Sequence, residues 1–264
     1  MVPVLDFRRK RLIGVVHLRP LPGSPRFEGT LDRIAQAAVA DARGYEDGGA
    51  DALFIENFGD VPFGKGPVGP ETVAAMAMIG CAVRAAVKLP IGFNVLRNDA
   101  RAALALCAAC GGSFVRVNVH IGAMVTDQGI IEGNAHETLR YRRQICPQAQ
   151  IFADVHVKHA VPLGSASLEQ ASRDTIERGL ADALIVSGPG TGIAAATDDV
   201  KRVRRVCPTS KILIGSGITV ENAHDFLALP DGMIVGTSLK RGGSIANPVD
   251  TQRVAKVSRI LAGR

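Results

Sequence analysis

The sequence predicts a single (β/α)8 TIM barrel, and three observations lead to this fold class. The chain has 264 residues, close to the roughly 250 residues typical of such a barrel. Short apolar runs alternate eight times with segments of helical length, the pattern of parallel strands joined by helices. The runs are rich in Val, Ile and Phe, as expected for strands covered on both faces. One domain over 1–264 is expected, with a doubly wound open sheet as the alternative.

The elements follow one another in a regular order. The expected strands are 12–18, 51–58, 90–96, 113–119, 150–157, 182–188, 211–217 and 232–237. The expected helices are 31–47, 70–88, 98–110, 134–144, 167–179, 196–207, 219–228 and 249–261. Residues typical of helix starts support several of them, such as Pro70 with Glu71 and Ser167 with Glu169.

Composition narrows the class of protein. The five cysteines are odd in number and scattered, which argues against a disulfide framework and for a reducing compartment. Cys107 and Cys110 lie in an apolar helix end and are interpreted as core residues rather than zinc ligands. Aromatic residues make up only 4% and the basic residues are spread out, so no nucleic-acid partner is expected despite a net charge of +6. No apolar run reaches the roughly 20 residues of a membrane span, so a soluble, cytoplasmic protein is expected.

Polar side chains gather where the predicted strands end. Active sites of (β/α)8 barrels lie at the C-terminal ends of the strands and on the loops that follow. The expected catalytic residues are His17, Glu56, Arg116, Asp154, His156 and Lys158. The expected substrate-positioning residues are Asn57, Asp60, Asn94 and Asn118.

The stretch ADVHVKHA, residues 153–160, concentrates these groups. Alternate residues of a strand share a face, so Asp154, His156 and Lys158 are expected to point together into the barrel. A buried charge without a partner costs several kcal/mol, so these groups should be paired across the barrel. A satisfied interior ion network without turnover is the alternative.

Glycine-rich turns follow the last three expected strands. Such turns let backbone N–H groups approach an anion, and barrels bind phosphate beyond strands seven and eight in this way. The alternative is that the glycines only permit tight turns. The expected phosphate-binding residues are Gly188, Gly190, Thr191, Gly215, Ser216, Gly217, Gly236 and Thr237.

No metal site is assigned and no organic cofactor is expected. Four carboxylates near the same rim offer oxygen ligands that would suit magnesium. They lack a diagnostic spacing, so magnesium dependence stays open. The four are Glu56, Asp60, Asp127 and Asp154.

Six motifs resemble the BtpA/SgcQ family in the same order over nearly the whole chain. They are IGVVHLRPLPGSP, DALFIENFGDVPF, GFNVLRNDA, FVRVNVHIGAMVTDQGIIEG, ADVHVKHA and ILIGSGIT. The resemblance implies a (β/α)8 barrel grouped with the ribulose-phosphate-binding barrels, and a family name drawn from photosystem I biogenesis. The decarboxylase branch of that superfamily uses an Asp-x-Lys-x-x-Asp array. In this chain Asp154 and Lys158 are four positions apart instead of two. The array is therefore absent, and the resemblance does not imply decarboxylation.

Two classes of function follow. The first is an enzyme that binds a phosphorylated sugar or nucleoside-like metabolite and performs acid/base chemistry of the isomerase or lyase type. Asp154 or His156 would transfer protons, and Lys158 or Arg116 would stabilise negative charge; a Schiff base at Lys158 is a variant. The second class is a non-catalytic assembly or stability factor of the BtpA type. The density of ionisable groups at one mouth favours the enzyme, while the substrate and a homo-oligomeric state stay open.

Overall fold

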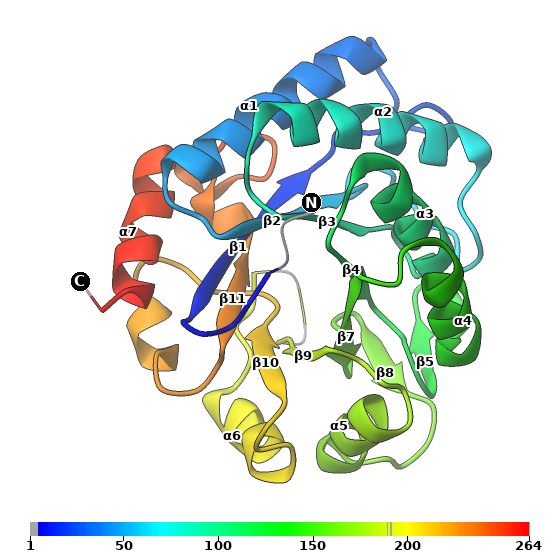
Figure 1. The fold of residues 1–264 in the computed structure, drawn as a ribbon, viewed down its shortest axis with the longest axis vertical. Coiled ribbons are helices and arrows are strands. Elements are labelled where there is room, and N and C mark those ends of the chain that lie inside the picture. Colours follow the sequence, from blue (N-terminus) through cyan, green and yellow to red (C-terminus); the bar gives the residue numbers. More distant parts are fainter. Residues whose placement is uncertain (1–4, 189, 191, 264) are drawn as a thin grey trace.

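Eight parallel strands close into a barrel, which confirms the predicted fold class (Figure 1). The computed structural model describes residues 5–188, 190 and 192–263. Around the barrel the strand order is β1-β11-β10-β9-β7-β4-β3-β2. The strands are β1 (Arg11–His17), β2 (Ala52–Glu56), β3 (Ile91–Asn94), β4 (Phe114–Val117), β7 (Gln150–Val155), β9 (Ala183–Val186), β10 (Lys211–Ile214) and β11 (Gly232–Val235).

Helices surround the barrel (Figure 1). They are α1 (Leu31–Asp47), α2 (Pro70–Ala86), α3 (Ala100–Cys110), α4 (Ala135–Ile145), α5 (Leu168–Glu177), α6 (Thr197–Val206) and α7 (Thr251–Leu261). Three short 3-10 turns are η1 (Ala223–Phe226), η2 (Thr237–Leu239) and η3 (Arg241–Gly243). As the sequence predicted, α2 begins at Pro70, and the Ser167 side chain accepts a hydrogen bond at the start of α5.

The expected helix over 219–228 is wrong, because only the turn η1 forms there. The Asn222 side chain accepts from the N–H of Thr219 and donates to the Gly217 carbonyl. These bonds fold the segment into a side-chain-stabilised turn, which competes with helix formation. Pro230 then prevents a helix from continuing toward β11.

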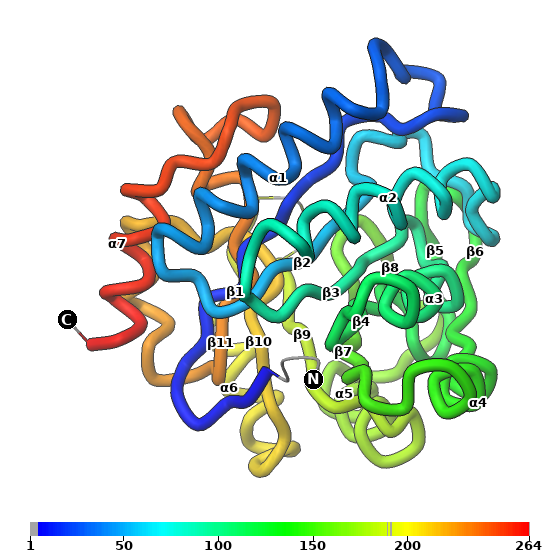
Figure 2. Tube along the Cα trace, turned by 45° about the horizontal axis from the view of Figure 1, so that its top comes forward, coloured from blue at the N-terminus to red at the C-terminus, as the bar shows by residue number. Residues whose placement is uncertain are grey.

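A small antiparallel sheet at the rim was not predicted. Its order is β6-β5-β8, with β5 (Ala123–Thr126) and β6 (Gly129–Glu132) from the loop after β4 and β8 (Ala160–Pro162) from the loop after β7. Figure 2 shows the three strands together beside the barrel. Its inner face packs Met124 and Ile131 against Val119 and Val157. The sheet therefore joins two of the loops that surround the mouth, meaning the open C-terminal end of the barrel.

Aromatic rings fill the lower barrel. The ring of Phe114 lies 4.8 Å from that of Phe54 and 5.1 Å from that of Phe152. Gly92 on β3 makes room for them, since a Cβ at this position would lie 2.1 Å from the Phe114 ring. The barrel centre is thus a packed core, as is usual for this fold.

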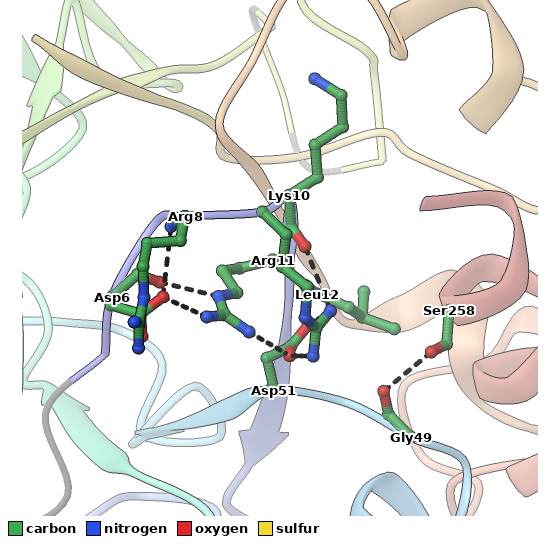
Figure 3. A network of polar contacts seen from close by, with 9 residues as sticks. Asp6, Arg8, Lys10, Arg11, Leu12, Gly49, Asp51 and Ser258 are labelled. Atoms are coloured by element: carbon green, nitrogen blue, oxygen red, sulfur yellow. Dashed lines mark hydrogen bonds and ion pairs between the residues drawn. The ribbon is translucent and has the colours of Figure 1, made fainter. Parts of the chain in front are cut away.

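A network of polar contacts joins the N-terminal segment to Asp51 at the N-terminal end of the barrel (Figure 3). Leu5 is buried among the interior residues, and the Phe7 ring lies 5.9 Å from that of Phe152. Beneath them Arg11 forms ion pairs with Asp6 and, at 3.0 Å, with Asp51. Among the described residues, this packing and these ion pairs cover the N-terminal end of the barrel, opposite the mouth.

The remaining sequence expectations concern cysteines and membranes. All five cysteines are free thiols, and Cys107 and Cys110 are buried in the core as predicted. Among the residues that the structure describes, no helix combines the length and apolar character needed to cross a bilayer.

Candidate functional site

A polar layer lies inside the barrel, between the packed aromatic core and the mouth. Each strand contributes the residue two positions after its last interior apolar or glycine residue, because alternate residues face the same side. For example, Glu56 follows Phe54 and Arg116 follows Phe114. The layer consists of His17, Glu56, Asn94, Arg116, Asp154, Ser187, Gly215 and Gly236.

Asp154 is held by donors on both oxygens. Arg116 donates to it through Nε and Nη2, each at 2.8 Å. Asn118 Nδ2 donates at 3.2 Å and Ser187 Oγ at 3.1 Å. The side chains of Arg116 and Asp154 are 3% and 0% exposed. A carboxylate so fully engaged is suited to fixing Arg116 in place rather than to accepting a proton from a substrate.

Glu56 has one oxygen less constrained. Asn94 Nδ2 donates to Oε2, while Oε1 lies 3.9 Å from His17 Nε2. Burial, reinforced by the nearby charges of Lys240, Lys158 and Arg116, holds the pKa of His17 well below its usual value. The imidazole is therefore neutral at physiological pH and does not pair with Glu56 as a cation. Oε1 of Glu56 thus remains available to exchange a proton.

Lys158 presents a cation to the mouth without a partner. Among the described residues, no side chain or carbonyl accepts a hydrogen bond from its Nζ. Burial lowers the pKa of Lys158, and the neighbouring Arg116 lowers it further. An unpaired, partly desolvated ammonium is suited to binding an anion or stabilising developing negative charge.

His156 does not share a face with Asp154, so that expectation is wrong. Strand β7 ends at Val155, and His156 adopts a φ of 53°, which reverses the alternation of side chains. Its ring lines a separate 480 Å³ cavity outside the barrel, together with His120 and Asp174. His156 is therefore not part of the mouth.

Two of the expected substrate-positioning residues form hydrogen bonds with the backbone of loops at the rim. Asn57 Oδ1 accepts from the N–H of Leu96 at 2.7 Å, and Asp60 accepts from the N–H of Leu21 at 2.8 Å. Asn57 Nδ2 also donates to Asp60 at 3.1 Å. Neither residue lines the two cavities of the mouth, so a role in positioning a substrate stays a prediction.

The mouth contains two cavities that meet at three shared residues. The first lobe, of about 300 Å³, lies over β10 and β11 and reaches Ser216, Thr237 and Arg253. The second lobe, of about 440 Å³, lies over β3 and β4 and contains Asn94 and Asn118. Both are lined by Glu56, Arg116 and Lys158. A larger cavity of about 590 Å³, beside α1, shares only His17, Phe58 and Val61 with the two lobes.

Only some of the expected phosphate-binding residues line the first lobe. Gly215, Ser216, Gly217, Gly236 and Thr237 line the first lobe. Gly188 and Gly190 do not line it, and Thr191 lies outside the described residues. In the part of the chain that the structure describes, no acceptor takes up the backbone N–H groups of Thr237 and Ser238.

Gly217 also has a structural requirement. Its φ is 73°, and a Cβ would lie 2.0 Å from the backbone nitrogen of Ala194. A side chain at this position would displace the neighbouring loop, so substitution of Gly217 does not isolate a role in binding. The tight-packing explanation therefore applies to Gly217, and its part in anion binding stays a prediction.

Two further cations, Arg97 and Arg253, line the mouth. Arg253, in the first turn of α7, lines the first lobe and donates through Nε to the Ser238 carbonyl at 2.6 Å. Arg97, on the loop after β3, lines the second lobe and is 5% exposed. A strand-end position was a signal for Arg97, whereas only the folded chain brings Arg253 to the mouth.

The carboxylates proposed for magnesium are not brought together. Among the described residues, no group of three or more His, Cys, Asp or Glu side chains is arranged to hold a metal ion. Asp154 is occupied by Arg116, and Asp60 by loop donors. The described residues of the mouth therefore include several cations that can face an anion, and magnesium dependence stays open.

Fold and site together define a (β/α)8 barrel whose mouth, among the described residues, is lined by cations, by the carboxylates of Glu56 and Asp127 and by the backbone of Thr237 and Ser238. Within that class the chain belongs to the BtpA family, whose model matches residues 8–263.

Relatives cover almost the whole chain. The photosystem I biogenesis protein BtpA of Synechocystis sp. is 45% identical over 251 residues, 95% of this chain and 88% of that protein. A protein of Archaeoglobus fulgidus is 48% identical over 254 residues, 96% of this chain and 99% of the relative. The putative sgc region protein SgcQ of Escherichia coli is 32% identical over 250 residues, 94% and 92% of the two chains.

Solved structures share the fold. Tryptophan synthase of Mycobacterium tuberculosis matches with a TM-score of 0.62 and 17% identity, over 97% of this chain and 93% of that one. Phosphoribosyl anthranilate isomerase of Thermus thermophilus matches with a TM-score of 0.57 and 16% identity, over 96% and 98%. At these identities the likeness concerns the barrel architecture alone.

Proposed function

We propose that the mouth is the active site of an enzyme that binds a phosphorylated small molecule and transfers a proton within it, as an isomerase or lyase does. The observation that carries this proposal is the junction of the two lobes. Among the described residues, a carboxylate, Glu56, and two cations, Arg116 and Lys158, line both cavities. A base beside fixed positive charges is the arrangement that proton abstraction next to a carbonyl requires.

The first lobe is the site proposed for the phosphate. The unpaired N–H groups of Thr237 and Ser238 and the guanidinium of Arg253 surround it. Backbone N–H groups and a cation together suit a phosphate, which has several acceptor oxygens. This position, beyond the last two barrel strands, is also where this fold commonly binds phosphate.

Glu56 is the proposed base. Its Oε1 takes the proton, the C–H electron pair moves into the adjacent carbonyl, and the resulting enolate oxygen is stabilised by Lys158 and Arg116. In an α-hydroxy carbonyl substrate, return of this proton to the former carbonyl carbon, together with transfer of the adjacent hydroxyl proton to the enolate oxygen, completes an isomerisation. Asp154 contributes as a positioning residue, because it holds Arg116 through two hydrogen bonds.

A non-catalytic assembly factor is the second candidate. It is favoured by the name of the Synechocystis relative, a photosystem I biogenesis protein 45% identical to this chain. A scaffold does not require an unpaired lysine and a poised carboxylate in one cavity. For this reason the enzyme ranks first.

Hydrogen exchange with solvent tests the proposed chemistry. The protein is incubated in D2O with a panel of sugar phosphates, and deuterium uptake at carbon is followed by NMR. We expect exchange with at least one compound, lost in Glu56→Gln but kept in Glu28→Gln, a control on the exposed loop after β1. Exchange that persists in folded Glu56→Gln would contradict the assignment of the base. Absence of both binding and exchange across the panel would favour the assembly factor.

A further inference from the structure

We infer that the second lobe binds an apolar, ring-sized group that carries a hydrogen-bond acceptor, so that the substrate has a phosphate at one end and this group at the other. The inference names the substrate class of the same mouth, and its phosphate half rests on the proposed function. It follows from the walls of the second lobe, from Arg97 and from the size of the cavity.

The walls of the second lobe are apolar where the loops cover it. Phe58, Val61 and Phe63 come from the loop after β2, and Leu96 comes from the loop after β3. The first lobe also has aliphatic residues in its lining, but among the described residues it has no phenyl ring, and glycines, hydroxyls and cations make up most of the remainder. Apolar walls bind apolar surface by removing it from water. The two lobes therefore suit chemically different halves of one ligand.

Arg97 is the polar group that distinguishes this apolar lobe. Its side chain is almost wholly buried, and its Nη2 donates to the Lys158 carbonyl at 2.8 Å. Across the described residues, no acceptor takes up Nε or Nη1, and neither atom is closed off from solvent. Those donors therefore face the cavity that Arg97 lines.

Water can reach these donors in the free protein, but a ligand that displaces this water leaves them unpaired unless the ligand offers an acceptor. Asp127 also lines this lobe, but no ion pair joins it to Arg97 among the described residues. A carboxylate or carbonyl on the ligand would complete the hydrogen bonds of Arg97. An apolar group without an acceptor would leave these donors unpaired and would be bound less well.

The size of the cavity agrees with a two-part ligand. The second lobe has about 440 Å³ against about 300 Å³ for the first. A small sugar phosphate seated in the first lobe reaches Glu56 and Lys158 at the junction but leaves the second lobe to water. A ligand that spans both lobes places its central atoms at the junction, beside the proposed base.

Matched ligands test the inference. Binding of propyl phosphate and 3-phenylpropyl phosphate is compared by calorimetry, and binding of benzoate and cyclohexanecarboxylate by ligand-observed NMR. The proteins are the wild type, Phe63→Ala, Arg97→Met and the control Arg143→Met, whose side chain is exposed on α4. Thermal melting verifies that each variant is folded.

We expect 3-phenylpropyl phosphate to bind roughly tenfold more tightly than propyl phosphate, because a phenyl ring is buried. Phe63→Ala should remove most of this difference without weakening propyl phosphate. Arg97→Met should weaken both ring carboxylates several-fold, while Arg143→Met changes nothing. If only benzoate binds, the group is aromatic; if both carboxylates bind, an aliphatic ring also serves. Either result supports the inference.

The outcomes separate the inference from the proposed function. If both phosphate esters bind equally and neither ring carboxylate binds, the inference is overturned and the phosphate site stands. If no phosphate ester binds but benzoate binds in a manner that depends on Arg97, the second lobe stands and the proposed phosphate site fails. Ring-carboxylate binding that is unchanged in both Phe63→Ala and Arg97→Met also overturns the inference.

Discussion

The Arg116–Asp154 pair gives a stability prediction whose size follows from the structure. In Asp154→Asn the side chain keeps its shape but loses its charge, so the Arg116 guanidinium is left without a counter-ion. Both side chains are closed to solvent, at 3% and 0% exposed. Removing one partner of such a pair costs about 3–5 kcal/mol. The loss is measured by urea unfolding, where the midpoint should fall with an unchanged slope.

Two controls define this result. Asp225→Asn, at an exposed carboxylate near η1, should change the free energy of unfolding by no more than about 0.5 kcal/mol. The double substitution Arg116→Met with Asp154→Leu should recover much of the loss, because an apolar pair avoids the cost of burying charge. A loss below about 1 kcal/mol in Asp154→Asn alone would refute the view that the pair is buried and mutually dependent.

Three further predictions concern groups outside this pair. Asp41→Asn should cost about 3–5 kcal/mol in urea unfolding, because it strips the counter-ion from Lys240, whose side chain is 2% exposed; an equal loss in Asp41→Asn and in the exposed Asp225→Asn would contradict this. Tyr45→Phe should cost about 1 kcal/mol, because the buried hydroxyl donates to a β1 carbonyl at 3.0 Å; no loss would mean that water replaces the bond. The unfolded chain protonates His17 near pH 6.5 while the folded protein keeps it neutral, so stability should fall as pH drops below that value, by about 1.4 kcal/mol at pH 5.5. His17→Asn should remove this loss of stability at low pH, whereas the substitution His224→Asn at an exposed site should not. Identical pH profiles of stability for the two variants would contradict the assignment of the loss to His17.

Much of the fold could be predicted because local pattern and tertiary structure agree. Eight apolar runs correspond to the eight barrel strands, and the expected helix over 31–47 has the same bounds as α1. The small rim sheet could not be predicted, because its strands of three or four residues come from separate loops and are stabilised by packing across them. Local propensity says little about such short, non-local strands.

The positions of the candidate residues were predictable wherever the strand pattern held. Glu56, Arg116, Asp154 and Lys158 all meet at the mouth, as strand-end positions indicated. The prediction failed at His156, because alternation was extended one residue beyond the end of β7. A positive φ at a histidine is uncommon and has no signal in a single sequence.

Roles within the site depended on partners that only the folded chain supplies. Asp154 was expected to transfer protons, yet its oxygens accept from Arg116, Asn118 and Ser187. Arg253 reaches the mouth from α7, far along the chain from the glycine-rich turns it faces. Sequence spacing indicates which residues end strands, but not which atoms remain free to meet a ligand.

The most direct test of the central claim is whether the mouth binds phosphate. Thermal melting of the wild type is followed with increasing inorganic phosphate and sugar phosphates, because a ligand of the folded state raises the melting temperature. At a hundredfold excess over Kd the gain is about 2.7 kcal/mol, or several degrees for a chain of this size. The account predicts a dose-dependent rise that is lost in Arg253→Met but kept in Arg259→Met, an exposed site on the same helix. No rise with any phosphate compound, or an equal rise in both variants, would contradict it.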